Sequence, residues 1–310
     1  MKPIISIKDI YKSYEDVEAL SGISIDIHES EIFGFIGPDG AGKTTLMRIL
    51  TTLILADKGV AHIMGYDVVN DFKTLRSKLG YMPGRFSLYQ DLSVEENLNF
   101  FAGIFKTTVK ENYHLIKDIY HQIEPFKKRR AGDLSGGMKQ KLALSCALIH
   151  QPQVLILDEP TTGVDAVSRT EFWNMLQKLK EQGMTIVVST PYMDEAARCD
   201  RIALIQKGKI MSVDKPERIV LGFKDHLYGL KAENMYQLVK RLRAYHDSIS
   251  VYLFGEWVHF STKKPVDESD LKSFLLADGI KDYKIKELQA NIEDSFMDLM
   301  IKTENEADNS

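Results

Sequence analysis

The stretch GPDGAGKTT, Gly37 to Thr45, constrains this chain more than any other segment. It fits the pattern G-x-x-x-x-G-K-[ST] and lies between the apolar run EIFGFIG and the helically spaced segment TTLMRIL. A strand, a glycine-rich turn and a helix in this order form a phosphate-binding loop. The glycines let backbone N–H groups close around phosphate oxygens, and the helix N-terminus adds positive potential. A glycine-rich turn that matches by chance is the alternative, and it would not require these flanking segments.

The loop predicts specific contacts with a bound nucleotide. Lys43 is expected to reach the β- and γ-phosphates, and the hydroxyl of Thr44 is expected to bind Mg²⁺. The residues assigned to nucleotide binding are Gly37, Pro38, Asp39, Gly40, Ala41, Gly42, Lys43, Thr44 and Thr45.

A second motif, VLILDEPTTG, brings two carboxylates to the end of a predicted strand. Four apolar residues precede Asp158 and Glu159, and ligands of open α/β sheets bind beyond the carboxyl ends of the strands. We expect Asp158 to hold Mg²⁺, directly or through water. Glu159 is expected to accept a proton from the attacking water or to orient it. An acidic pair that caps a helix is the alternative, and the phosphate-binding loop in the same chain disfavours it.

A third motif, LSGGMKQ, precedes Asp158 in the chain. Ser135 stands before Gly136 and Gly137 at the start of a predicted helix, and such a helix end attracts anions. Alone, the motif is equally typical of a turn followed by a helix cap. Its position ahead of the second motif favours the anion-binding interpretation.

Together the three motifs, in this order, resemble the ATP-binding cassette (ABC) family: Walker A GPDGAGKT, signature LSGGM and Walker B VLILDE. The resemblance covers about residues 4–220. It extends to GVDAVSR, where Asp165 matches the aspartate of the loop after Walker B. It also extends to Tyr14, which matches the aromatic residue that stacks on adenine, although Tyr11 lies nearby and leaves this assignment open.

The resemblance implies ATP and Mg²⁺ as cofactors and ATP hydrolysis as the activity. Two cassettes would pair head to tail, so that Ser135, Gly136 and Gly137 serve the partner's ATP while Lys43 serves the subunit's own. Closure around ATP would move a separate membrane permease. The carboxyl-terminal segment that ends in IEDSFMDLM resembles the type that works with export-class ABC-2 permeases.

Two positions depart from the family pattern. Cassettes usually carry Gln after the third strand, in a segment such as Y-M-P-Q, whereas this chain has Gly84 in GYMPGRFSLYQ. Where the family has a His that reaches the γ-phosphate, this chain has Pro191 in IVVSTPYMDEA. Proline offers no backbone N–H and no side-chain donor. Nothing in the sequence shows that Arg85, Gln90 or Tyr192 takes over either role.

These departures lead to a hypothesis about rate and pairing. Loss of one positioned electrostatic donor typically lowers a rate by about 10²–10³, so ATP binding should survive while hydrolysis at this subunit's own site is slow. Intact Glu159 indicates that some activity remains. We expect pairing with a different cassette that has the Gln and the His, with a homodimer of relaxed geometry as the alternative. An ATP-gated regulatory clamp and a soluble non-transport cassette protein are the alternative functions.

Composition bounds the class of protein. The 310 residues are 27% charged and 44% apolar, which is typical of a soluble globular chain of about two domains. A net charge of −4 does not favour nucleic acid as the main partner. Two cysteines without metal-type spacing fit a reducing compartment. No apolar run approaches the roughly 18 residues of a spanning helix. We therefore expect a cytoplasmic protein, held peripherally at the cytoplasmic face of the cell membrane by its permease.

The expected fold class is α/β: a P-loop NTPase with a RecA-like core and a helical signature subdomain, followed by a small carboxyl-terminal α+β appendage. Strands that alternate with helices are typical of a mostly parallel sheet. We place the cassette domain at residues 1–220, with its helical subdomain at about 84–152. The appendage is expected at 221–302, and the polar tail 303–310 is expected to be disordered.

Overall fold

Two units make up the chain in the computed structural model, which describes residues 2–308 and, for 304–308, the backbone alone. The amino-terminal unit is Met1–Pro216 and the carboxyl-terminal unit is Glu217–Ser310. The domain boundary expected at residue 220 falls within α7 (Pro216–Leu221). No helix within residues 2–308 is both long enough and apolar enough to cross a membrane.

A six-stranded sheet forms the centre of the amino-terminal unit, in the order β10-β9-β3-β8-β7-β6. Five strands run parallel, and β10 pairs antiparallel at the edge. The parallel strands β3, β7 and β8 are buried along their whole length, as strands covered on both faces require. The strands are β3 (Ile32–Ile36), β6 (Leu79–Met82), β7 (Val154–Asp158), β8 (Thr185–Thr190), β9 (Arg201–Gln206) and β10 (Lys209–Asp214).

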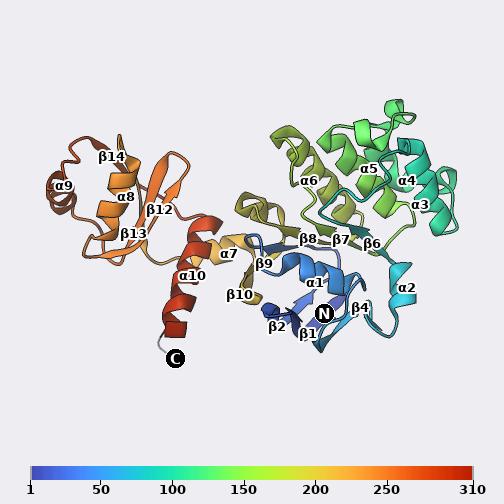
Figure 1. Ribbon diagram of the computed structural model, residues 1–310, viewed down its shortest axis with the longest axis horizontal. Helices are drawn as coiled ribbons and strands as arrows, with labels where there is room; N and C mark the ends of the chain where they lie inside the picture. Colours follow the sequence, from blue (N-terminus) through green and yellow to red (C-terminus); the bar gives the residue numbers. More distant parts are fainter. Residues whose placement is uncertain (1, 309–310) are drawn as a thin grey trace. The chain divides into compact units, whose positions relative to one another are not determined.

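A second, antiparallel sheet lies on the other side of helix α1 (Lys43–Leu50), which runs between the two sheets (Figure 1). Leu46, Met47 and Leu50 of this helix are buried in one core with residues of both sheets. The second sheet has the order β2-β1-β4-β5. Its strands are β1 (Ile5–Tyr14), β2 (Val17–Ile27), β4 (Lys58–Ile63) and β5 (Tyr66–Asp67).

The other helices of this unit include a group of three, α3, α4 and α5, which pack together (Figure 1). A capping box starts the first of them: the N–H of Glu96 donates to Oγ of Ser93 at 3.2 Å, and the N–H of Ser93 donates to Oε2 of Glu96 at 2.8 Å. The helices are α2 (Phe72–Arg76), α3 (Val94–Ile104), α4 (Val109–Tyr120), α5 (Gly136–Leu148) and α6 (Ala166–Glu181), with 3₁₀ segments η1 (Glu124–Phe126), η2 (Ala131–Asp133) and η3 (Met193–Arg198).

The carboxyl-terminal unit has the α+β character expected from its sequence. Its antiparallel sheet has the order β12-β13-β11-β14, and the chain runs strand, helix, strand, strand, helix, strand, which is the split βαβ arrangement. The hairpin of β12 and β13 turns at Gly255, whose φ is +56°. The elements are β11 (His226–Ala232), α8 (Met235–Arg243), β12 (Ser248–Phe254), β13 (Trp257–Thr262), α9 (Glu268–Leu276), β14 (Tyr283–Glu287) and α10 (Ile292–Asp308).

The end of the chain differs from the expectation of a disordered tail at 303–310. Helix α10 continues to Asp308, so residues 303–308 have a helical backbone. Each residue added to an existing helix gains one hydrogen bond without a new nucleation step, which lets a polar segment extend a helix that packing has already formed. Residues 309–310 lie outside the described part of the chain.

Candidate functional site

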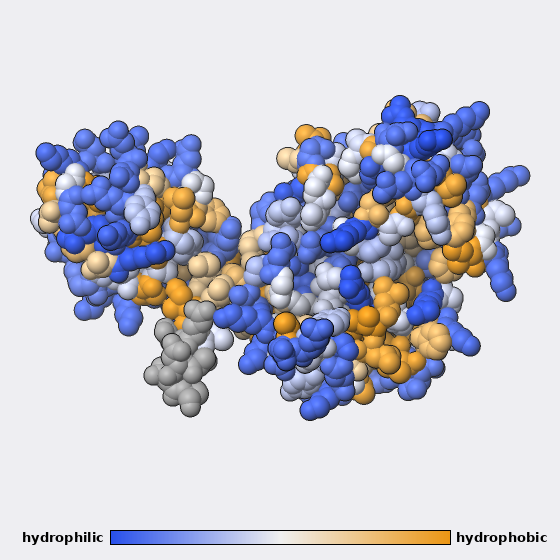
Figure 2. All heavy atoms as spheres, viewed as in Figure 1, coloured by the Kyte–Doolittle hydropathy of each residue, from blue (hydrophilic) through white to orange (hydrophobic). Residues whose placement is uncertain are grey.

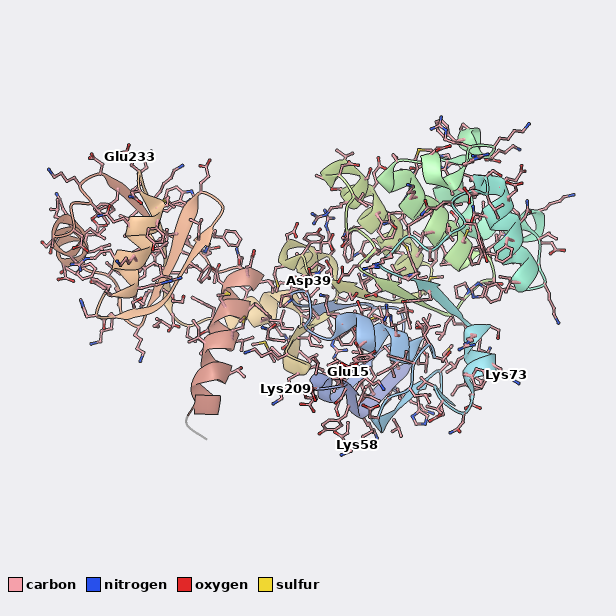
Figure 3. The ribbon with its side chains drawn as sticks, in the orientation of Figure 1. Glu15, Asp39, Lys58, Lys73, Lys209 and Glu233 are labelled. Atoms are coloured by element: carbon pink, nitrogen blue, oxygen red, sulfur yellow. The ribbon has the colours of Figure 1, made fainter. Side chains whose placement is uncertain are left out.

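The loop from Gly37 to Gly42 connects β3 to α1 in a conformation that only glycine adopts without strain at its last position. Gly42 has a φ of +103°, and a Cβ there would come within 2.4 Å of the carbonyl oxygen of Ala19. A Cβ on Gly37 would lie 2.1 Å from the carbonyl oxygen of Ile205. The loop therefore passes close to the backbone of β2 and β9. Asp39 lies on it, at the entrance to α1 (Figure 3).

Lys43, the first residue of α1, is only 3% exposed. Its Nζ donates to the carbonyl oxygens of Gly37 and Pro38 at 2.8 and 3.0 Å, and lies 3.5 Å from Oε1 of Glu159. A buried ammonium requires such partners. They hold the charge beside the loop, where phosphate oxygens can replace them as stronger acceptors.

Asp158, at the end of β7, is likewise only 3% exposed. Its Oδ1 accepts hydrogen bonds from Oγ1 of Thr44 at 3.1 Å and from Oγ of Ser189 at 2.6 Å. Burial and the neighbouring Asp158 carboxylate raise the pKa of Tyr81 to about 12. The structure thus brings together Thr44 and Asp158, the two residues that the sequence assigns to Mg²⁺.

The oxygen donors of Thr44 and Asp158 fit a hard cation that takes its other ligands from phosphates and water, as Mg²⁺ does. Among the side chains that the structure describes, those of residues 2–303, no three of His, Cys, Asp or Glu form a group that could hold a metal.

Glu159 follows Asp158 with a φ of +48°, in the left-handed region that is uncommon for a residue with a side chain. Its N–H is shared between the carbonyl oxygen of Ser189 at 3.0 Å and Oγ of Ser189 at 3.1 Å. The hydroxyl of Thr162 lies 3.4 Å from Oε2. The carboxylate remains partly exposed and stands beside Lys43, where it can act on a water molecule.

The starts of helices α5 and α6 lie against each other. Ser135 caps α5 by accepting a hydrogen bond from the N–H of Met138 at 3.4 Å, and Asp165 caps α6 by accepting one from the N–H of Ser168 at 3.0 Å. The latter bond holds the pKa of Asp165 below its usual range. A Cβ on Gly137 would meet Oγ of Ser168 at 2.5 Å. The structure therefore joins the signature motif to the loop after Walker B.

Tyr14 and Tyr11 differ in their surroundings, although both are partly exposed. Tyr11 packs across Gly22 of β2, so closely that a Cβ on Gly22 would reach its hydroxyl at 2.8 Å. Tyr14 stands at the end of β1, with Nζ of Lys12 5.7 Å from its ring centre. This difference favours Tyr14 as the residue that stacks on a base.

Gly84 lies beside the backbone of Asp158 and Cβ of Glu159 but contributes no side chain. A Cβ there would come within 3.1 Å of the carbonyl oxygen of Asp158 and 3.6 Å of Cβ of Glu159. Arg85, the next residue, is exposed. The carbonyl oxygen of Gln90 accepts a hydrogen bond from the N–H of Gly132 at 2.9 Å, which ties Gln90 to the segment before the signature helix.

The residues on either side of Pro191 are held by contacts within the protein, which does not favour a role in sensing phosphate. The hydroxyl of Thr190 donates to Oε2 of Glu195 at 2.6 Å and accepts a bond from the N–H of Tyr192 at 3.1 Å. The ring of Tyr192 lies under the guanidinium of Arg169, 4.6 Å away. Tyr192 is thus engaged with α6.

Sequence reasoning missed two buried groups next to the site. Ser189 is fully buried and contacts both acidic residues. Glu195 is also buried, and its Oε1 accepts from Oγ1 of Thr161 at 2.7 Å and lies 3.2 Å from Nε of Arg169. The sequence does contain a signal that could have identified Ser189, because it is a polar residue at the end of an apolar strand. Glu195 stands in an acidic segment and shows no sign of burial in the sequence.

A groove of about 670 Å³ opens between α2, β6 and the helices α3 and α5. Figure 2 shows apolar side chains gathered beside α2, and Lys73 projects from that helix in Figure 3. The ring of His150 stacks on Phe105 with centroids 3.7 Å apart, and burial lowers the pKa of His150. The groove is lined in part by Leu53, Phe86, Phe101, Ile104, Phe105 and His150, with Lys73 and Arg76 also in its wall.

Comparison with known proteins assigns the chain to a family. A family model described as ABC transporter matches residues 20–162. The Nod factor export ATP-binding protein I of Rhizobium sp. strain N33 is 33% identical over 271 residues, which cover 85% of this chain and 88% of that relative. The chain belongs to the ATP-binding proteins of the ABC transporter family. This cassette protein is also 36% identical over 303 residues, or 96% of its length, to the probable multidrug ABC transporter ATP-binding protein YbhF of Escherichia coli K12. It spans 52% of that relative's length.

Solved structures share the fold of the cassette protein. One is an ATP-binding cassette solved as a dimer in a post-hydrolysis state with ADP and Pi, with a TM-score of 0.62 and 26% identity over 68% of this chain and 98% of that chain. Another is an ATP-binding subunit of an ABC transporter, with a TM-score of 0.65 and 25% identity over 71% of this chain and 93% of that chain. The predicted P-loop NTPase fold is confirmed.

Proposed function

We propose that this cassette protein is the nucleotide-binding subunit of an ABC exporter, which binds and hydrolyses ATP to drive transport through a separate membrane permease. The observation that carries the proposal is the convergence of Lys43, Thr44, Asp158 and Glu159 at the junction of β7 and α1. Relatives named for multidrug transport and Nod factor export support the export direction.

Each side chain of the site has a distinct role in this proposal. The loop N–H groups and Lys43 bind the phosphates, and Tyr14 stacks on the adenine. Thr44 and Asp158 hold Mg²⁺, which neutralises charge on the phosphates when bound. Glu159 orients the attacking water or accepts its proton.

The subunit's own site is proposed to hydrolyse ATP slowly. Gly84 stands beside Asp158 and Glu159 without a side chain, and Pro191 has no donor. Tyr192 is held by Arg169 and so does not supply the missing imidazole. Binding depends on other groups and should remain, which also keeps an ATP-gated clamp with little hydrolysis as a second candidate function.

A partner with the complete set of residues would explain why the signature motif is intact. We propose a heterodimer in which Ser135, Gly136 and Gly137 complete the ATP site of a second cassette. The close approach of Gly137 to Ser168 links the start of the signature helix to the loop that carries Asp165. A homodimer is the alternative.

The groove beside α2 is proposed as the place where an ABC-2-type permease docks. It lies next to Gly84, at the edge of the helical subdomain proposed at 84–152, and its apolar lining suits an inserted helix. The permease would hold the cassette protein peripherally at the cytoplasmic face of the membrane.

The proposal is tested by ATP turnover of the purified chain, alone and mixed with a cassette that carries Gln and His at the two altered positions. We expect ATP binding with weak turnover alone and higher turnover in the pair. Failure to bind ATP would contradict the function. Robust turnover alone, abolished by Glu159→Gln, would contradict the slow site. Binding without any turnover in the pair or with a permease would favour the clamp.

A further inference from the structure

The hydroxyl of Ser189 contacts both acidic residues of the site. The parallel register of β7 and β8 pairs Ser189 with Asp158, which brings their side chains to the same face of the sheet. Oγ of Ser189 donates to Oδ1 of Asp158 at 2.6 Å and accepts from the N–H of Glu159 at 3.1 Å. Ser189 is 0% exposed, so it is sealed from any ligand.

We propose that Ser189 is the positioning residue of this site: it orients the Asp158 carboxylate for the cation of a bound nucleotide and fixes the backbone that carries Glu159. The inference deepens the proposed function and rests on it. Ser189 acts through Asp158 and Glu159, and touches neither nucleotide nor metal.

The bonds to Asp158 show how the orientation is set. Both hydroxyl donors, Thr44 and Ser189, bond to Oδ1, and Oδ2 receives no hydrogen bond from the residues that the structure describes. Oδ2 therefore remains available for a cation or for a water bound to one. Thr44 is itself assigned to the cation, so Ser189 is the donor that stays with the carboxylate when the site is filled. Groups that orient a metal ligand in this way typically change metal affinity by about 10–100-fold when removed.

The bond to Glu159 has a second consequence. Glu159 has a φ of +48°, a region that a side-chain-bearing residue occupies only when its surroundings hold it there. The Ser189 carbonyl and hydroxyl both accept from its N–H. Removing the hydroxyl leaves the carbonyl bond but loosens the peptide that directs the Glu159 carboxylate, so catalysis should fall in addition to cation affinity.

The competing explanation is that the Ser189 hydroxyl only supplies hydrogen bonds to buried polar groups at the end of the strand. Ser145 offers a matched control, since it is also 0% exposed and its Oγ donates to the carbonyl oxygen of Lys141 at 2.8 Å, within α5. A general loss of stability from a buried serine would appear in both variants. A positioning role predicts an effect on the cation for Ser189 alone.

The experiment measures the affinity of the full chain for a fluorescent ATP analogue, once with Mg²⁺ and once with EDTA. The gain in affinity that Mg²⁺ provides is the readout. We expect Ser189→Ala to reduce this gain by about tenfold, with affinity in EDTA unchanged. Ser189→Cys, which has a somewhat larger side chain and only a weak donor, should behave in the same way and serves if the alanine variant does not fold. Ser145→Ala should keep the wild-type gain.

A wild-type gain in both Ser189 variants, or an equal loss in Ser145→Ala, would overturn the assignment. These outcomes are separate from failure of the proposed function, which would appear as an unmodified chain that does not bind the ATP analogue even with Mg²⁺.

Discussion

Gly84 lies against Asp158: a Cβ at Gly84 would approach the carbonyl oxygen of Asp158 to 3.1 Å. A residue without a side chain thus lies beside Asp158 and Glu159, at the sequence position where the family pattern has glutamine. The space there is tight but can accept a side chain if the neighbours shift by a few tenths of an ångström, as the distance indicates. A glutamine introduced at this position requires such a shift of the Asp158 backbone.

Restoring both missing groups should raise hydrolysis at this site. We expect Gly84→Gln with Pro191→His to increase single-turnover ATP hydrolysis by at least about tenfold, because one positioned electrostatic group is worth roughly 10²–10³ in rate and crowding at Gly84 will remove part of the gain. The control, Gly84→Ala with Pro191→Ala, introduces the Cβ without a donor. Equal rates in the unmodified chain and the Gln/His variant would show that these positions do not limit turnover.

Glu159→Gln should separate hydrolysis from binding. The amide keeps the size of the side chain but cannot accept a proton, so turnover should fall by about 10²–10⁴ while ATP still binds. Single-turnover hydrolysis and equilibrium ATP binding measure the two effects. Glu171→Gln is the matched control, because Glu171 pairs with Lys141 at 2.7 Å on the surface of α6. Unchanged turnover in Glu159→Gln would remove Glu159 from catalysis.

Lys43→Ala should weaken ATP binding by about 10–100-fold, the equivalent of a hydrogen bond to a charged group. The change also leaves Glu159 without its cationic neighbour 3.5 Å away. Binding of a fluorescent ATP analogue measures the loss, and Lys58→Ala, a change at an exposed lysine of β4, is the control. Lys43 would have no role in nucleotide binding if the two variants bound ATP equally well.

Ser135→Ala should impair the ATP site of a partner cassette and leave the ATP site of the variant chain unchanged. Its cap on α5 is lost, which lowers stability by about 1 kcal/mol, and the anion-binding helix end loses its hydroxyl. Turnover in mixed pairs should fall while ATP binding to the variant chain is unchanged. Ser93→Ala removes a similar cap from α3 and is the control. The head-to-tail arrangement would be contradicted if Ser135→Ala reduced only the chain's own ATP affinity.

Asp294 should make the carboxyl-terminal unit sensitive to acid. Burial acts to raise the pKa of Asp294, but contacts with His259, Tyr252 and the N–H of Asn291 outweigh it, so the pKa lies below its usual value. The distances to these partners are 2.7, 2.5 and 2.9 Å. A carboxyl with a lowered folded-state pKa stabilises the fold above its unfolded pKa of about 3.9 and loses that effect as the pH falls through the folded value.

Asp294→Asn should therefore destabilise this unit by about 1–3 kcal/mol at pH 7, since it weakens buried hydrogen bonds to a charged group. The difference from the unmodified protein should shrink below pH 4. Urea unfolding followed by Trp257 fluorescence in a Trp173→Phe background measures it. Asp278→Asn, at an exposed carboxylate that pairs with Arg241, should have little effect at either pH. A difference that stays constant with pH would contradict the assignment.

Local sequence determined the parts of this protein that depend on neighbouring residues. The glycines from Gly37 to Gly42 and the helix that follows define the phosphate-binding loop, and Ser93 with Glu96 defines a helix start. Each involves groups a few residues apart, so the pattern alone fixes the geometry. The family and its P-loop NTPase fold followed from these motifs and their order. The helical end of α10 did not, because its polar residues carry no periodic apolar signal.

Tertiary structure decided which distant residues meet at the site. Ser189 reaches Asp158 and Glu159 because β8 pairs with β7 in one register, and a shift of one residue would turn its hydroxyl to the other face. Tyr192 turns to Arg169, and Glu195 becomes buried, for the same reason: strand pairing and packing place α6 beside the end of β8. The sequence by itself marked Gly84 and Pro191 as departures. Only the fold showed that Gly84 lies against Asp158 and that the side chain after Pro191 is held elsewhere, because contacts across strands are set by register and packing.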